Sequence, residues 1–191
     1  MEVIDLFPSP VIRFSNVISE EERMSILSGV KDIPSQNYPA IEGDGVSSFQ
    51  TDSKILDTFD LRLRVIEKLS EYSRHVGVAP CRITNSWFSI QQPGSKLNQH
   101  NHPGSMVSGV IYVNVDENSS KLFFDNPNEI LHYTWWKGVG WTDYNCEYST
   151  IEPKNGDLIM FPSWLKHGSM DQENKTKDRT IISFNSVFYN Q

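Results

Sequence analysis

Apolar positions in the first 80 residues recur every three or four places, which is typical of amphipathic helices. Ser19 stands before three glutamates, and Glu22 at the third place after it completes a capping-box pattern. We therefore expect a helix that begins after Ser19 and runs to about Lys31. A second amphipathic helix is expected over about 54–77. Its apolar residues at helical spacing are Ile55, Phe59, Leu63, Ile66 and Leu69.

The segments that flank these helices have no helical pattern. Residues 2–14 alternate between apolar and polar types and contain Pro8 and Pro10, so we expect an edge strand interrupted by prolines. Residues 33–53 are rich in Pro, Gly, Ser and Asp and predict a long loop. Long loops in compact domains are often functional.

From Cys81 onward the pattern changes to short strands separated by turns, such as Pro93-Gly94, Pro103-Gly104 and Asn155-Gly156-Asp157. The expected strands are 81–92, 97–102, 105–115, 120–125, 147–152, 157–161, 166–170 and 179–189. Helices followed by many short strands predict a mainly β chain. Its core would be a jelly roll or β-sandwich, with the N-terminal helices packed on one sheet.

The length of 191 residues fits one domain that buries a sizeable core. We expect residues 1–80 to supply the N-terminal strand and supporting helices, and residues 81–191 to form the jelly-roll core. Cys81 and Cys146 match no zinc pattern and are too few for a disulfide framework, which favours a reducing compartment.

The formal net charge of -7 argues against a broad nucleic-acid surface, because phosphate binding depends on clustered Lys and Arg. Small-molecule or peptidyl partners are favoured instead. The N-terminus has no basic stretch, and no apolar run approaches the length of about 18 residues that a membrane span needs. We therefore expect a cytoplasmic protein. The N-terminal edge strand is also compatible with a homodimer.

Candidate chemistry begins with His100 and His102, which stand one residue apart before the turn at Pro103-Gly104. In an extended segment, side chains at i and i+2 leave the same face about 7 Å apart, close enough for two imidazoles to bind one metal ion. A third ligand from a distant strand would leave coordination positions open, which is typical of catalytic sites. His75 and His132 have no partner at ligand spacing.

His167 is the candidate third ligand, because it follows an apolar strand and a Pro turn. Arg179 then opens a strand in which Arg179, Ser183 and Asn185 share one face. An arginine facing the interior of a jelly roll is costly unless an anion pairs with it. A bound carboxylate would satisfy the guanidinium through two hydrogen bonds, although a salt bridge to one of the 24 acidic residues is the simpler alternative.

Residues 84–189 carry further motifs in addition to these groups. They are Pro93-Gly94, His100-Asn101-His102-Pro103-Gly104-Ser105, Ser108-Gly109-Val110-Ile111-Tyr112, Phe124-Asp125-Asn126-Pro127, the segment Pro153 to Pro162, His167, and the segment Arg179 to Asn185. In these motifs the chain resembles the 2-oxoglutarate and Fe(II)-dependent oxygenases, in particular the prolyl 4-hydroxylase-like branch and its bacterial and viral relatives.

The resemblance implies a double-stranded β-helix in which His100, His102 and His167 hold iron. It also implies that Arg179 binds the distal carboxylate of 2-oxoglutarate, with Tyr112 as a hydroxyl partner and Ser183 assisting. The cofactors would be Fe(II), 2-oxoglutarate and O2. The implied reaction hydroxylates a C–H bond of an amino acid, peptide or small molecule and releases succinate and CO2.

One position departs from the pattern of the wider oxygenase superfamily. Most members have Asp or Glu where this chain has His102, so the ferrous site would carry one more positive charge. Either the site consists of three histidines, or a carboxylate such as Asp125 completes it. We favour three histidines, because position 102 fits the family's ligand position.

Other classes of protein remain open at this point. A cupin-like three-histidine dioxygenase would use iron without 2-oxoglutarate, and succinate formation separates the two enzymes. The string His100-Asn101-His102 is similar to an HNH nuclease motif, but the acidic chain lacks a basic groove. A jelly-roll binding module without catalysis would bind neither ferrous iron nor 2-oxoglutarate. Among the oxygenases, residues 33–53 and the aromatic-rich insertion 131–148 are the candidates for a substrate-covering lid.

Overall fold

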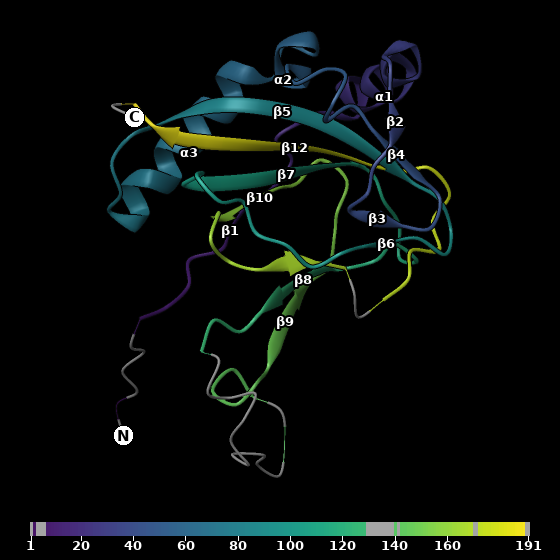
Figure 1. Cartoon of the computed structure of the whole chain (residues 1–191). Helices are drawn as coiled ribbons and strands as arrows, with labels where there is room; N and C mark the ends of the chain where they lie inside the picture. The colour runs from purple at the N-terminus through teal and green to yellow at the C-terminus, as the bar shows by residue number, and fades with distance from the viewer. Residues whose placement is uncertain (1, 3–6, 129–139, 141, 170–171, 190–191) are drawn as a thin grey trace.

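The strands form two layers that face each other, one of them a seven-stranded sheet, and the helices cover the outer face of this larger sheet (Figure 1). The computed structural model describes residues 2, 7–128, 140, 142–169 and 172–189. The predicted architecture, a mainly β jelly roll with N-terminal helices on one sheet, is confirmed.

The larger sheet is antiparallel throughout and has the strand order β1-β10-β7-β12-β5-β4-β2. Its strands are β1 (Ile12–Phe14), β10 (Leu158–Pro162), β7 (Val107–Asn114), β12 (Arg179–Phe188), β5 (Cys81–Gln91), β4 (Gly45–Ser47) and β2 (Gln36–Asn37). The facing layer contains the sheet β11 (His167–Gly168), β8 (Leu122–Asp125) and β9 (Tyr148–Ile151), and the pair β3 (Ile41–Glu42) and β6 (Lys96–Leu97). The helices are α1 (Glu20–Gly29), the 3-10 turn η1 (Val30–Asp32), α2 (Ile55–Thr58) and α3 (Arg62–Val76).

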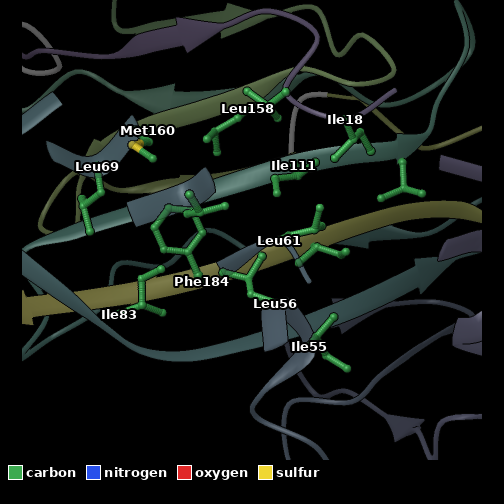
Figure 2. Packing of buried hydrophobic residues seen from close by; sticks show 14 of the residues in the cluster. Ile18, Ile55, Leu56, Leu61, Leu69, Ile83, Ile111, Leu158, Met160 and Phe184 are labelled. Carbon is green, nitrogen blue, oxygen red and sulfur yellow. The ribbon is translucent and has the colours of Figure 1, made fainter. Parts of the chain in front are cut away.

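Alternation along the central strands divides the core into two parts. On β7, Ile111 and Val113 belong to the cluster beneath the helices, which Figure 2 shows around Phe184. Val110 and Tyr112 belong to a second cluster, between the two sheets. The side chains that face the space between the sheets are therefore those of every second residue.

One of the two predicted helices agrees with the structure more closely than the other. The helix after Ser19 begins as expected, although its α-helical part ends at Gly29. The second is two helices, because the chain breaks at Asp60, whose φ of 54° is left-handed. The break shifts the helical phase, so that Leu61 is buried while Leu63 is 78% exposed. The prediction that Leu63 lies on the buried face is wrong.

Other segments also differ from expectation. The predicted loop 33–53 contains β2, β3 and β4, of which β2 and β4 extend the larger sheet beyond β5. Strand pairing in the predicted strand 97–102 is limited to Leu97 and a single bridge at His100. The expected strand 2–14 is paired only from Ile12 to Phe14, and residues 3–6 lie outside the described part. Most of the insertion 131–148 also lies outside it, including Tyr133, Trp135, Trp136, Trp141 and His132.

The capping box at the start of α1 also anchors this helix to α3. Ser19 Oγ accepts the Glu22 N–H at 3.2 Å, and Glu22 Oε2 accepts the Ser19 N–H at 2.7 Å. Arg64 donates to the same carboxylate at 2.8 Å. The hydrogen bonds from Arg64, followed by that from the Ser19 backbone, lower the pKa of Glu22 to about 2.

Glu22→Gln is expected to lower the free energy of unfolding at pH 7 by about 0.5–1 kcal/mol, because both partners of the ion pair are more than a third exposed and solvent screens them. A carboxyl whose folded pKa is depressed stabilises the protein above its unfolded pKa, and this contribution is lost as the pH falls towards 2. Denaturant titrations at several pH values should therefore show a weaker acid destabilisation in the variant. If the variant and the wild type lost the same stability at acidic pH, Glu22 would not have this role.

Candidate metal centre

The three predicted histidines meet at one point between the two layers. His100 and His102 follow β6, and His167 begins β11. The backbone N–H groups of His100 and His167 each donate to the other's carbonyl at 2.9 Å, which fixes the two segments side by side. The ring centroids lie 4.4 Å apart for His100 and His167, and 5.0 Å apart for each of the other two pairs.

The orientation of the rings suits a metal ion. The Nδ1 atoms of His100 and His167 each contact a backbone carbonyl at 2.8 Å, those of Asn98 and Leu165 respectively. These contacts favour the tautomer in which Nδ1 carries the proton and Nε2 offers a lone pair. His102 Nε2 lies only 3.2 Å from His167 Nε2, and one nitrogen from each ring lies within 4.8 Å of the others. A divalent cation would satisfy all three nitrogens.

The protonation states favour metal binding as well. Burial lowers the pKa of His102 to about 4 and that of His167 to about 3, and the neighbouring His100 acts in the same direction. Both rings are therefore neutral at pH 7, and neutral imidazole is the form that binds metals.

Within the described part of the chain, the group with metal-ligand spacing that contains these residues consists of the three histidines alone. Asp125 is not a member. It lies on β8 and lines a separate surface depression with Pro8 and Tyr148. His75, which we expected to have no ligand role, lies exposed at the end of α3.

A buried hydrogen-bond network supports the segment that carries His102. The His102 N–H donates to the carbonyl of Ser163 at 2.9 Å, and the Ser163 hydroxyl lies 2.8 Å from that of Ser108. Ser108 in turn donates to Asn185 Oδ1 at 2.8 Å. The hydrogen bond between Ser108 and Ser163 could not be predicted from the sequence, because the two residues stand 55 positions apart.

A pocket extends from the histidines into the space between the sheets. Arg179, Ile181 and Ser183 line it, as the alternation along β12 predicted. Arg179 is 4% exposed, and its guanidinium lies 5.9 Å from the centre of the Tyr112 ring. Burial lowers the pKa of Arg179, although a guanidinium is not deprotonated in proteins. Burial also raises the pKa of Tyr112 to about 12, so that its phenol is protonated at pH 7.

Around Arg179 lie buried polar groups whose hydrogen bonds are incomplete. Four buried atoms have no partner: Arg179 Nε, Gln91 Nε2, Tyr112 Oη and Ser120 Oγ. Each unsatisfied buried polar group costs about 1–3 kcal/mol, so this group of atoms is suited to an anionic ligand with several acceptor oxygens. Gln91 and Ser120 were missed from the sequence, because they stand 88 and 59 positions from Arg179 and only the tertiary fold brings them to it.

Aromatic rings lead from the molecular surface to the histidines. Tyr38 contacts Phe49 at 5.4 Å between ring centroids, Phe49 contacts Trp87 at 4.9 Å, and Trp87 lies 6.2 Å from His102. Tyr38 and Phe49 both come from the segment 33–53, and Tyr38 and Trp87 line the pocket. This segment therefore forms part of the wall beside the histidines.

Comparison with known proteins agrees with the geometry. The family model described as "Putative 2OG-Fe(II) oxygenase", in which 2OG denotes 2-oxoglutarate, matches residues 85–185, just over half of the chain. The matched part contains the three histidines and Arg179. No curated protein matches in sequence. Of the described residues, none forms a helix long and apolar enough to cross a bilayer.

Solved structures share the fold. HygX from Streptomyces hygroscopicus, with nickel, 2-oxoglutarate and hygromycin B bound, is 12% identical with a TM-score of 0.63, over 95% of this chain and 84% of that one. A Pseudomonas putida prolyl-4-hydroxylase is 15% identical with a TM-score of 0.56, over 94% and 93%. A viral collagen prolyl hydroxylase from Paramecium Bursaria Chlorella virus-1 is 12% identical with a TM-score of 0.54, over 92% and 94%.

These structural neighbours confirm the predicted double-stranded β-helix. The family uses Fe(II), 2-oxoglutarate and O2, so the expected cofactors and the expected enzyme class are confirmed as well. On the match over residues 85–185, the chain belongs to the 2OG-Fe(II) oxygenase family.

Proposed function

We propose that the protein hydroxylates a C–H bond of an amino-acid, peptidyl or small-molecule substrate, with His100, His102 and His167 holding ferrous iron. Arg179, Tyr112 and Ser183 bind 2-oxoglutarate in this proposal. The observation that carries it is that one pocket is lined both by three histidines whose imidazole nitrogens converge and by a buried, incompletely bonded guanidinium.

Bound iron, 2-oxoglutarate and O2 supply the oxidising chemistry, with succinate and CO2 as coproducts. The chain's own residues orient the reactants. The carbonyls of Asn98 and Leu165 hold two imidazoles in the ligating tautomer, and Arg179 binds the distal carboxylate. Ser183 lies on the same face of β12 as Arg179, two residues beyond Ile181, and lines the same pocket as the arginine and the histidines.

The substrate lies on the aromatic side of the histidines in this proposal. Apart from the histidines, the titratable side chains among the described pocket-lining residues are Tyr38, Tyr112 and Arg179, and the lining contains no acid. The reacting group is therefore uncharged and packs against Trp87 and Tyr38. The segment 33–53 contributes Tyr38 and Ile41 to the pocket, which supports its role as a cover. The single domain, the homodimer and the lid formed by 131–148 stay predictions.

The structure argues against two alternative functions, a dioxygenase that does not use 2-oxoglutarate and an HNH-type nuclease. A three-histidine dioxygenase that does not use 2-oxoglutarate would need no anion at Arg179, and the unsatisfied polar atoms there argue against it. A nuclease of the HNH type would place its motif in a ββα unit. Here His100 and His102 lie between β6 and β7 instead.

Anaerobic addition of Fe(II) and then 2-oxoglutarate to the metal-free protein is expected to produce the weak visible charge-transfer band of a chelated 2-oxo acid. Arg179→Met should weaken 2-oxoglutarate binding by about 10- to 100-fold, because it removes a desolvated, charge-assisted contact. The matched control is Arg74→Met, an exposed arginine on α3. Iron binding without any band would favour the dioxygenase that does not use 2-oxoglutarate, and turnover without succinate formation would favour the same enzyme.

A further inference from the structure

Gln91 lies directly opposite Arg179 where β5 and β12 pair. The two side chains are 1% and 4% exposed. Arg179 Nη1 donates to Gln91 Oε1 at 2.5 Å, and Nη2 donates to the carbonyl of Ser120 at 3.4 Å. The amide oxygen of Gln91 thus accepts from the arginine, whereas its amide nitrogen, Nε2, has two N–H groups and no hydrogen-bond partner.

The partners of Arg179 are neutral, which is unusual for a buried cation. Of the residues that the structure describes, none forms a salt bridge with Arg179, although Arg13 on β1 pairs with Asp157 at 3.0 Å. A buried guanidinium normally has a carboxylate beside it, because an uncompensated charge is costly away from water. Gln91 has the shape of glutamate, but its amide oxygen accepts from Arg179 without carrying a charge. The positive charge of Arg179 therefore stays uncompensated in the protein alone.

We infer that Gln91 is a specificity-determining residue for the cosubstrate: it holds Arg179 in place without neutralising it and donates from Nε2 to the same ligand carboxylate. This inference rests on the proposed function of the pocket. A glutamate at position 91 would occupy Arg179 with an internal ion pair and would repel the ligand. The amide thus selects a 2-oxo acid that carries a second, distal carboxylate.

Gln91→Glu tests the inference, since it changes charge while keeping shape. Titration of 2-oxoglutarate into the Fe(II)-loaded protein without oxygen is expected to show about 100-fold weaker binding than in the wild type. The metal-free variant should melt at the same temperature or higher, because the new carboxylate compensates Arg179. A gain in stability together with a loss of affinity is the signature of a charge effect, whereas damage to the fold would lower both.

Two comparisons sharpen the test. The probe 2-oxopentanoate has the same carbon chain as 2-oxoglutarate and lacks the distal carboxylate, so its affinity should change far less in Gln91→Glu. Ser70→Glu, at an exposed position on helix α3, adds the same charge and should bind both ligands as the wild type does. If Gln91→Glu does not fold, Gln91→Met replaces it, with an expected loss of about tenfold in 2-oxoglutarate affinity.

The failures of the two hypotheses are distinguishable. If the position-91 variant binds 2-oxoglutarate as the wild type does while Arg179→Met loses it, the inference about Gln91 is wrong and the cosubstrate pocket stands. If both variants bind as the wild type does, the proposed cosubstrate site itself is wrong. Equal losses for 2-oxoglutarate and 2-oxopentanoate would also overturn the inference, because they would show a general distortion of the pocket.

Discussion

Replacing His167 with alanine is expected to lower the affinity for ferrous iron by on the order of 1,000-fold and to abolish turnover. Loss of a hydrogen-bond partner behind a metal ligand typically costs 10- to 100-fold, and loss of the ligand itself should cost more. His167 is the most buried of the three histidines, and its Nε2 lies 3.2 Å from that of His102. Anaerobic iron titration of the metal-free protein measures the effect directly.

The control for this variant is His75→Ala, which removes an exposed imidazole from the end of α3 and should leave iron binding unchanged. Circular dichroism would show that His167→Ala remains folded. Tight binding of one iron per chain by His167→Ala would contradict the three-histidine site.

His102 allows a second comparison, because the sequence left open whether a carboxylate takes part in the metal site. His102→Asp should retain iron better than His102→Ala, because a carboxylate can bind ferrous iron and a methyl group cannot. This ordering follows if residue 102 is a ligand, and equal binding by the two variants would point to a different third ligand.

Most of the candidate site could be predicted from the sequence, because the placement of its residues depends on their spacing within short segments of chain. The spacing of His100 and His102 places two imidazoles near each other in any extended segment. The alternation from Arg179 to Ser183 places both residues on one face of β12, whatever the rest of the fold. Gln91 could not be found in this way, since its relation to Arg179 is a strand register between residues 88 positions apart.

The fold was predicted less evenly. The jelly roll followed from the order of helices and strands, but the apolar spacing over 54–77 fits one continuous helix. The spacing cannot show that Asp60 adopts a left-handed conformation and resets the phase. Likewise β2 and β4 are too short to be recognised in residues 33–53, because their pairing depends on the neighbouring strand β5.

The same break in the helix leads to the largest expected effect on stability. Leu69→Ala should lower the free energy of unfolding by about 2–5 kcal/mol, as is usual when a fully buried leucine is truncated. Leu69 is 1% exposed and belongs to the cluster between α3 and the larger sheet, where Figure 2 shows it near Met160. Chemical denaturation monitored by circular dichroism would measure the change.

Leu63→Ala is the matched control, because it makes the same substitution on the same helix and so has the same effect on intrinsic helix propensity. Leu63 is 78% exposed, and its replacement should change stability by no more than about 0.5 kcal/mol. A continuous helix over 54–77 would instead place both leucines on one buried face, so that both variants would be strongly destabilised. The difference between the two free energies therefore tests the phase of α3, and with it the break at Asp60, independently of any metal or cosubstrate.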